Sequence, residues 1–310
     1  MLVLATAYWG VSFPIIKAIM DLDRRMAPGA GTWFVAAGAL APRFLIAALL
    51  MLVFRRRADG LPTRAECLQG LGIGFMTTAG TLLQTDGLQF TAASTSSFLT
   101  QFSAILIPAW VALHSRRSPG FLVWASCVLV LAGVGILGHF DWRSFRFGRG
   151  EWETLLCSLF FTGQILWVGK PEYAGNRPGP VTLVVFASEA AAFSLLALAT
   201  APNLGSLAAP WASPAWLGLT LVLAVVCTIG AFNLMNRWQP RISSTEAGLV
   251  YCAEPLFTSV FVLFTPAAIS AAAGIRYANE TATWSLLVGG GLITVANAVM
   301  QLKARGEAAG

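Results

Sequence analysis

A glutamate followed by a proline stands inside a long apolar segment, at Glu254 and Pro255 in the stretch YCAEPLFT. If a helix enters the membrane near Thr245, Glu254 lies about nine residues in, or ~14 Å at 1.5 Å per residue, close to mid-bilayer. An ionised carboxylate facing lipid there costs at least ~2.5 kcal/mol, so it must face protein or water, or be protonated. Pro255 removes a backbone donor, which predicts a bend where the helix lines a cavity. Glu254 can bind an amino group or carry a proton; a structural ion pair or a packing kink is the alternative.

Polar and aromatic residues recur along the chain at spacings that place them on one face of a helix, as they do around Glu254. Tyr251, Glu254 and Thr258 follow the spacing i, i+3, i+7 and therefore share one helix face. Aromatic rings in such stripes can stack on a solute, and amides can hydrogen-bond its polar ends. One stripe alone is more typical of interhelical hydrogen bonding, but several together favour a shared polar cavity. The candidate substrate-binding residues are Trp9, Phe13, Gln84, Ser97, Gln101, Gln164, Trp167, Asn233, Tyr251 and Glu254.

Two further charges lie deep in apolar segments. Arg43 follows Pro42 near the middle of one segment, and Glu189 has a similar depth in another. Neither can face lipid without a large cost, so each is expected to have a partner. Arg43 can pair with Glu254 or with Glu189, and the sequence does not choose between them. For Arg43 a structural or coupling charge is favoured over a substrate-binding role.

The chain has 310 residues, of which 56% are hydrophobic and 11% are charged. A soluble domain carries roughly a quarter charged residues, whereas apolar runs of about 20 residues, enough to cross a bilayer, recur here. The net charge of +6 indicates loop arginines beside acidic lipid headgroups, and no basic stripe indicates a nucleic-acid partner. We therefore predict an all-α integral membrane protein with ten transmembrane helices near 2–20, 32–54, 68–90, 92–113, 121–140, 153–170, 180–201, 215–236, 245–270 and 283–302.

Residues that would carry enzymatic or metal chemistry are scarce. The five cysteines are scattered without a CxxC pair, and the two histidines, His114 and His139, stand near predicted helix ends. No HExxH or GxSxG motif is present. We therefore expect no catalytic residue, no metal site and no cofactor. The alternatives to a transporter are an integral-membrane enzyme and a lipid-handling protein without a solute pathway.

The second half of the chain resembles the first half after a shift of 150 residues. Five helices in each half is an odd number, so the halves are predicted to insert in opposite senses, with a substrate site near the midplane between them. The predicted repeats span 1–140 and 150–303, followed by a short tail, 304–310. In this register Gln89, Ser94, Thr95, Leu99 and Leu106 fall on Gln239, Ser244, Thr245, Leu249 and Leu256.

Loop charges predict the orientation of the chain in the membrane. With ten spans both termini lie on one side. Lysine and arginine residues in the loops number twelve on that side and six on the other. The excess of positive charge places both termini in the cytoplasm by the positive-inside rule.

Five segments resemble, in their order and spacing, the EamA-type transporters of the drug/metabolite transporter superfamily. These segments are Trp9–Phe13, Pro42–Leu50, Ser96–Ala104, Thr245–Phe257 and Asn279–Ile293, the last with Glu280 at the family's glutamate position. The chain departs from the family at Ala104, where many relatives have proline, and at Arg116, where a glutamate often stands. The connection 265–280 also lacks the family's usual short turn.

The resemblance implies a fold, a function and a setting. Helices one, three, four, six, eight and nine would surround a central cavity, with five and ten at the periphery. The implied function is secondary transport, more commonly export, of amino acids or related small metabolites by alternating access. The implied setting is the lipid bilayer of a bacterial inner membrane. A homodimer is compatible with this reading, but a monomer is sufficient.

Overall fold

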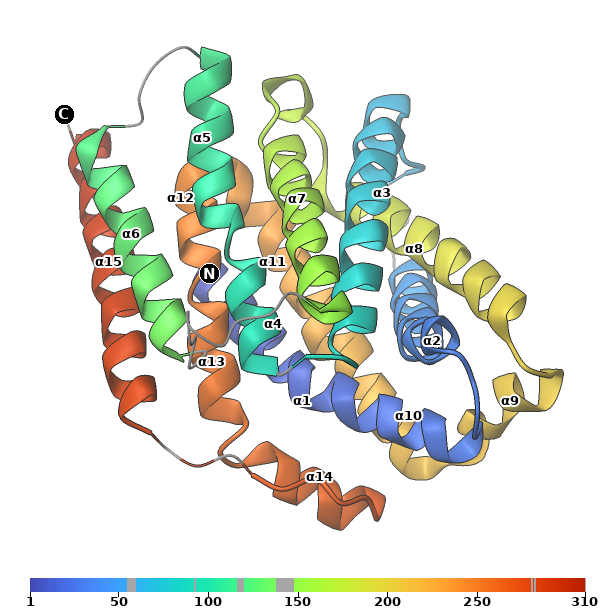
Figure 1. Ribbon diagram of the computed structural model, residues 1–310. Coiled ribbons are helices and arrows are strands. Elements are labelled where there is room, and N and C mark those ends of the chain that lie inside the picture. Colours follow the sequence, from blue (N-terminus) through green and yellow to red (C-terminus); the bar gives the residue numbers. More distant parts are fainter. Residues whose placement is uncertain are drawn as a thin grey trace.

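The computed structural model describes residues 1–54, 60–91, 93–115, 120–137, 148–279, 281 and 283–309. Every regular element among these residues is a helix, as the all-α prediction requires (Figure 1). The predictions that involve Arg116, His139 and Glu280 concern residues outside the described part of the chain, and so do several loop arginines used for the orientation.

The helices of the first half follow the predicted ranges closely, except for one break. The predicted helix 92–113 is not continuous, because the α-helical hydrogen bonding stops after Thr100 and resumes at Ser103. Shorter bonds replace it, from Phe102 N to Leu99 O (3.2 Å) and from Ala104 N to Gln101 O (2.9 Å). No proline or glycine stands at this break. The described helices are α1 (Leu2–Met26), α2 (Thr32–Val53), α3 (Arg64–Gly87), α4 (Ala93–Thr100), α5 (Ser103–Ser115) and α6 (Phe121–Leu137).

The second half contains more interruptions. Between α10 and α11 the chain forms a π-helical turn, Leu223–Gly230, so the predicted helix 215–236 is irregular in its middle. Short connecting turns of 3₁₀ helix cover Pro171–Tyr173, Ala209–Ala212 and Gln239–Arg241. The α-helices are α7 (Arg149–Val168), α8 (Pro178–Thr200), α9 (Leu204–Ala208), α10 (Pro214–Val222), α11 (Ala231–Trp238), α12 (Ser244–Tyr251), α13 (Glu254–Phe261), α14 (Thr265–Ala273) and α15 (Trp284–Ala309).

The predicted helix 245–270 is wrong as a single helix, and Pro255 explains the first of its two breaks. Pro255 has no N–H to donate, so the α-helical ladder ends at Tyr251 and a new helix starts at Glu254, with the proline in its first turn. The second break precedes α14. There the chain bends by 59° between Ser244–Phe261 and Thr265–Ala273.

In the part of the chain that the structure describes, four helical segments are long and apolar enough to span a membrane by length and composition alone. They are Leu2–Met26, Thr32–Val53, Pro178–Thr200 and Pro214–Arg241, and the bent pair that begins at Ser244 makes a fifth candidate. The other predicted spans are broken, shorter or less apolar. Large apolar side chains such as Phe75, Leu113 and Leu195 are exposed on the surface, as a lipid-facing surface requires.

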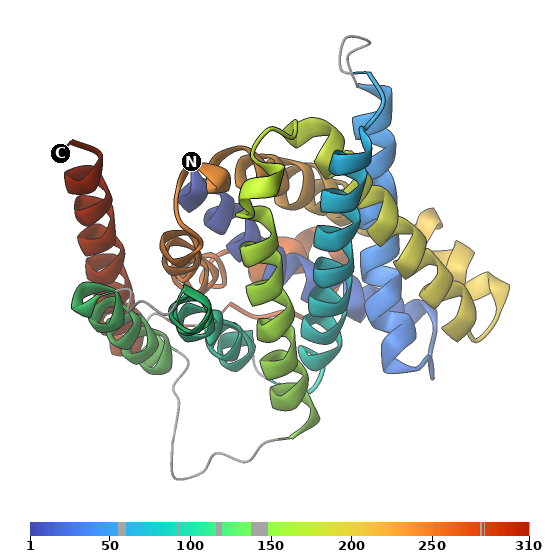
Figure 2. The ribbon, with the colours of Figure 1, turned by 90° about the horizontal axis from the view of Figure 1, so that it is seen from above.

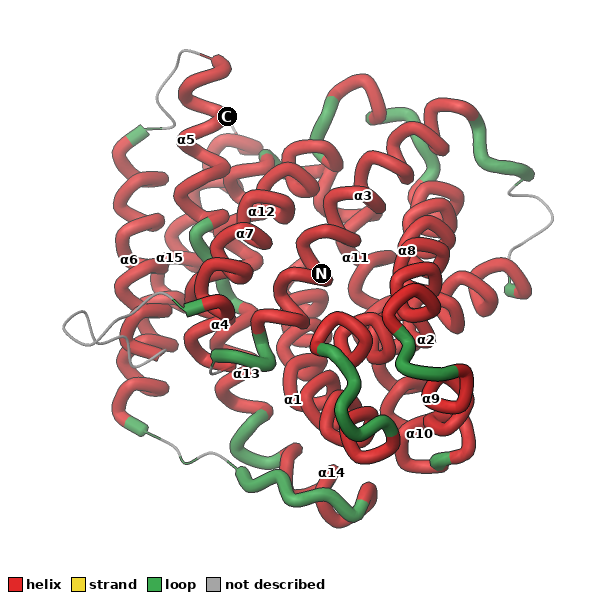
Figure 3. The backbone as a smooth tube through the Cα atoms, turned by 45° about the vertical axis from the view of Figure 1, so that its right-hand side comes forward, coloured by secondary structure: helices red, strands yellow, loops and turns green. Residues whose placement is uncertain are grey.

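The helices pack mostly across the two halves of the chain. α2 packs on α8, α3 packs on α7 and α8, and α6 packs on α15. The α6–α15 pair lies at one edge of the bundle, where the resemblance places helices five and ten (Figure 2). The short helices α9 and α14 lie at one end, near the end of α1 (Figure 3).

Glycine permits the closest of these helix contacts. At Gly133 of α6 an added Cβ would lie 2.6 Å from the carbonyl oxygen of Gly289 in α15. At Gly10 of α1 it would lie 2.8 Å from Cβ of Phe257 and 2.9 Å from the backbone nitrogen of Thr258 in α13. Small residues therefore set the spacing of both helix pairs, as they do in other membrane bundles.

Candidate functional site: a cavity between the two halves of the chain

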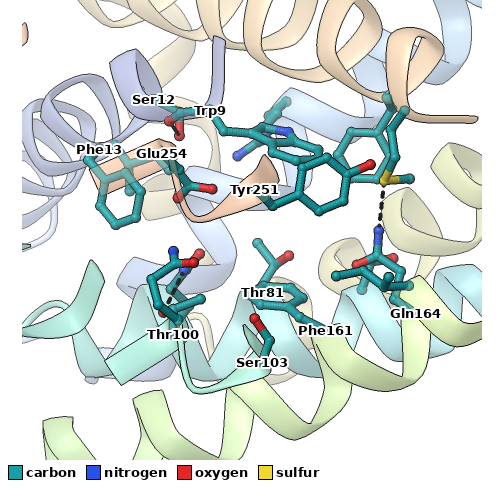
Figure 4. A pocket seen from close by; sticks show the side chains of 18 residues that line it. Trp9, Ser12, Phe13, Thr81, Thr100, Ser103, Phe161, Gln164, Tyr251 and Glu254 are labelled. Carbon is teal, nitrogen blue, oxygen red and sulfur yellow. Dashed lines mark hydrogen bonds between the residues drawn. The ribbon is translucent and has the colours of Figure 1, made fainter. Parts of the chain in front are cut away.

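A polar and aromatic cavity of about 100 Å³ lies inside the bundle, where α1, α3, α7 and α11 meet the two broken helices (Figure 4). Both halves of the chain supply its walls. A volume of this size holds several water molecules or a small solute, and is below the ~300–1,000 Å³ typical of sites for drug-sized ligands. Its lining residues are Trp9, Ser12, Phe13, Ile16, Arg43, Thr77, Thr81, Gln84, Thr100, Gln101, Ser103, Phe161, Gln164, Ile165, Phe232, Met235, Tyr251 and Glu254.

Glu254 faces this cavity from the first turn of α13. The break before Pro255 places its carboxylate at a helix N-terminus, where the unpaired backbone N–H groups favour negative charge. Figure 4 shows the side chain pointing toward Ser12 and Phe13 of α1. Within the described residues the carboxylate has no hydrogen bond and no ion pair, so the pairing of Arg43 with Glu254 is absent from this structure.

Aromatic rings form one wall of the cavity. The Trp9 ring packs edge-on against Tyr251 at 5.3 Å and against Phe232 at 5.9 Å between ring centroids. The Tyr251 hydroxyl donates to Oε1 of Gln239 (2.9 Å), and Nε2 of Gln239 donates to the carbonyl oxygen of Ile165 (2.8 Å). This buried network ties α12 to the last turns of α7. Flat apolar faces beside a polar network can hold a solute that has both an apolar and a polar part.

Amide and hydroxyl groups form the opposite wall. Nε2 of Gln84 donates to Oγ1 of Thr100 at 3.3 Å, and Nε2 of Gln164 lies 3.2 Å from the sulfur of Met235. Gln101 lies in the break between α4 and α5, which turns its side chain into the cavity lining. These groups offer both donors and acceptors, so they can bind polar ends of either kind.

Arg43 reaches the cavity from α2 and is 4% exposed. Its Nε donates to Oγ1 of Thr228 at 2.5 Å, in the π-helical turn, and its guanidinium carbon lies 4.9 Å from the Phe44 ring centroid. Glu189 of α8 is fully buried outside the cavity lining, and neither of its carboxylate oxygens has a hydrogen bond among the described residues. Arg43 and Glu189 lie near enough for a Coulombic attraction, but no ion pair within 4.0 Å forms between them. Of the two partners that the sequence allowed, Glu189 is therefore the neighbour of Arg43.

The structure brings most of the predicted site residues together and leaves three apart. Ser97 is buried outside the cavity, and its hydroxyl has no partner there. Trp167 lies at the end of α7, with its ring 3.7 Å from Nζ of Lys170. Asn233 lies in a separate pocket beside Leu50. The seven others, Trp9, Phe13, Gln84, Gln101, Gln164, Tyr251 and Glu254, line one cavity together with Arg43.

Several lining residues were not among the predicted site residues. Phe232 and Met235 share the face of α11 that meets α1, and Phe161 lies three residues before the predicted Gln164 on α7. Ser12 and Ser103 are small polar residues beside predicted ones. The spacing i, i+3 of Phe232 and Met235 was the available signal. Within the described residues, no three histidine, cysteine, aspartate or glutamate side chains come close enough to hold a metal ion.

Ion clusters tie the helices together at both ends of the bundle. At one end Arg149 of α7 pairs with the buried Asp86 of α3 and, through Nε, with Glu153 at 2.7 Å. At the other end Glu66 caps α3 with Thr63 and accepts from Nε (2.7 Å) and Nη2 (2.8 Å) of Arg177. The Arg177 hydrogen bond lowers the pKa of Glu66 from its ordinary value to about 2.

Comparison with known proteins identifies the class. Residues 1–138 match the model of the EamA-like transporter family. An uncharacterized transporter of Archaeoglobus fulgidus is 26% identical over 267 residues, which cover 84% of this chain and 75% of that protein. A solved crystal structure of a protein, 16% identical, superposes with a TM-score of 0.63 over 96% of this chain and 97% of the other, and thus shares the fold.

The apolar helical bundle, the cavity inside it and these matches define a multi-pass membrane transporter. Residues 1–138 match the EamA-like transporter family, the family that the sequence resemblance predicted.

Proposed function

We propose that this transporter moves amino acids or related small metabolites across a cell membrane, as an exporter, by alternating access through the central cavity. The observation that carries the proposal is the carboxylate of Glu254, which lines a polar, aromatic cavity and has no partner among the residues that the structure describes. A buried charge without a partner costs several kcal/mol less once a ligand of opposite charge pairs with it. A substrate ammonium group, or a proton, can serve as that partner.

Two inverted five-helix repeats, 1–140 and 150–303, are part of the proposal. The two broken helices support it, because their breaks lie 150 to 151 residues apart. Phe102 N bonds to Leu99 O at 3.2 Å, and Cys252 N bonds to Leu249 O at the same distance. The cross-half pairing of α2 with α8 and of α6 with α15 is what a two-fold relation between the halves would give.

The breaks supply the conformational freedom that alternating access needs. Each broken helix places a cavity residue at its break, Gln101 in one half and Glu254 in the other. Tyr251 and Trp9 line the cavity and pack edge-on beside the Gln239 network, and we propose that this contact opens when the cavity faces that side. One chain encloses the cavity, so a monomer is sufficient for the cycle.

Reconstitution in liposomes tests the function. Purified protein in vesicles loaded with an unlabelled amino acid mixture should take up external labelled amino acid by exchange, and empty vesicles should not. Uptake of an amino acid that the parent protein exchanges and Glu254→Gln does not would support the site as well. No exchange of any amino acid, with exchange of another solute class, would overturn the substrate assignment.

Reporter fusions test the repeats and the orientation. A reporter fused after Gly60 and one fused after Gly148 are separated by three predicted spans, so they should report opposite sides of the membrane. With cytoplasmic termini the first should report the cytoplasm. The same side for both fusions contradicts the inverted-repeat arrangement.

A further inference from the structure

Two oppositely charged side chains line the cavity without pairing with each other. The Glu254 carboxylate has no hydrogen bond or ion pair among the described residues. Arg43 makes one hydrogen bond there, from Nε to Thr228, which leaves its two terminal nitrogens without a hydrogen-bond partner. The cavity therefore presents one cationic donor group and one anionic acceptor group.

The free edge of the Arg43 guanidinium is directed at the cavity and not into the protein. Neither terminal nitrogen has a hydrogen-bond partner among the described residues, and neither is fully buried. Both therefore keep some accessible surface. Since Arg43 lines the cavity and is otherwise buried, this surface belongs to the cavity. Thr228 and the Phe44 ring hold the rest of the side chain, which fixes the direction of the guanidinium.

Glu189 balances the charge of Arg43 from behind. It is fully buried, does not line the cavity, and neither of its oxygens has a hydrogen bond. A carboxylate in this position keeps a buried arginine charged, because it supplies the opposite charge nearby. It leaves the terminal nitrogens available, because no ion pair within 4.0 Å forms.

We propose that the cavity binds a zwitterionic solute, with the solute's carboxylate on the terminal nitrogens of Arg43 and its ammonium group on Glu254, while Glu189 positions Arg43. The planar guanidinium fork suits a carboxylate, which it can bind through two parallel hydrogen bonds. This inference rests on the proposed transport function and deepens it. It makes Arg43 the residue that selects amino acids over simple amines, a role beyond structural pairing.

Two matched probe series test the inference with the intact protein. One is alanine, ethylamine and propionate; the other is phenylalanine, 2-phenylethylamine and 3-phenylpropionate. The melting temperature is measured with each probe, because a ligand that binds the folded state raises it. In at least one series the zwitterion should stabilise the protein at concentrations roughly tenfold below those required for its amine or its acid. Equal effects of zwitterion and amine, or no effect of any probe, overturn the inference.

Variants assign the two ends of the solute. Arg43→Gln should bind the zwitterion no better than the amine, with amine binding retained. Glu254→Gln should bind the zwitterion no better than the acid. If Arg43→Gln fails to fold, the double variant Arg43→Gln with Glu189→Gln removes both buried charges together and avoids an uncompensated one. A folded variant that lacks Arg43 and still prefers the zwitterion overturns the inference.

Transport measurements separate this inference from the function on which it rests. If the parent protein exchanges a solute in liposomes but shows no preference for zwitterions, the inference fails and the transporter stands. If it exchanges none of the amino acids, amines or acids, the proposed substrate class fails as well.

Discussion

The charged residues at the centre of the bundle and those at its ends differ in how they are paired. At the ends, Asp86 and Glu66 are buried, and each is bound by an arginine. At the centre, Glu189 and Glu254 have no hydrogen bond and no ion pair among the described residues. The same residue types thus occur in two states, satisfied and unsatisfied.

We propose that this difference separates charges that stabilise the fold from charges that take part in transport. A buried carboxylate with a bidentate arginine stabilises the place where two helices meet. A buried carboxylate without one is costly, and is expected where a ligand or proton supplies the partner. End charges should therefore affect mainly folding stability, and central charges mainly transport.

The largest effect is expected at Glu254. Glu254→Gln keeps the size of the side chain and removes its charge, so exchange of amino acids should fall about hundredfold, or about 2.7 kcal/mol. Because the carboxylate has no partner to lose, the melting temperature should stay the same or rise. The control is Glu172→Gln, which changes an exposed glutamate and should leave both unaffected. Exchange at the parent rate would make Glu254 a packing residue.

Removing the arginine at one end should have the opposite profile. Arg149→Ala leaves Asp86 buried without its cation, which should lower the free energy of unfolding by about 2 kcal/mol, less than for a fully buried pair because Arg149 is half-exposed. Exchange per folded molecule should be retained. Arg237→Ala, at an exposed arginine without an ion pair in the described residues, serves as the control. A loss of exchange without a loss of stability would place Arg149 in the transport pathway.

Tyr251 lies between the two regions and should show both effects. Tyr251→Phe removes the hydroxyl that binds Gln239 but keeps the ring against Trp9. The buried Gln239 oxygen loses its donor, so we expect a loss of about 1 kcal/mol in the free energy of unfolding. Exchange should fall severalfold, since we propose that the Tyr251–Trp9 contact opens during the transport cycle and the Gln239 hydrogen bond positions Tyr251. Denaturant unfolding and vesicle exchange measure the two effects, and an unchanged exchange rate would confine the contact to stability.

The smallest effect is expected at Glu66 and depends on pH. The pKa of Glu66 in the folded protein, about 2, lies below its ordinary value of 4.5, so its contribution to stability is complete above the ordinary value and is lost as pH falls toward 2. Glu66→Gln should therefore be less stable than the parent at neutral pH, by less than about 1 kcal/mol because Arg177 is partly solvated. The difference should vanish in acid. A difference that persists at low pH would trace to the helix cap instead.

Much of this protein could be predicted from its sequence. Long apolar runs with few charges define helices for a bilayer, because only such segments satisfy their own backbone there. A glutamate and a proline inside one apolar run predicted a bend where the helix lines a cavity. The structure has a helix break there, and Glu254 lines the cavity. The order of short motifs indicated a resemblance to the EamA-type transporters, and the match of residues 1–138 to the EamA-like family model agrees with it.

The tertiary structure decided which faces of the helices meet. In a membrane the core-facing and lipid-facing sides of a helix are both apolar, so periodicity does not separate them as it does in water. Trp167 and Asn233 therefore looked like cavity residues but lie elsewhere, whereas Phe232 and Met235 line the cavity.

The break before Ser103 and the partner of Arg43 also required the fold. No local residue signals that break, and two glutamates at similar depth were equally available to Arg43. Helix packing placed Glu189 near Arg43 but outside the cavity lining, and placed Glu254 in the cavity. The partner of a charged residue depends on which way its helix face points as well as on the depth of the residue in the membrane. The sequence determined which charges lie in the membrane, and the packing of α2 against α8 determined which of them remain unpaired.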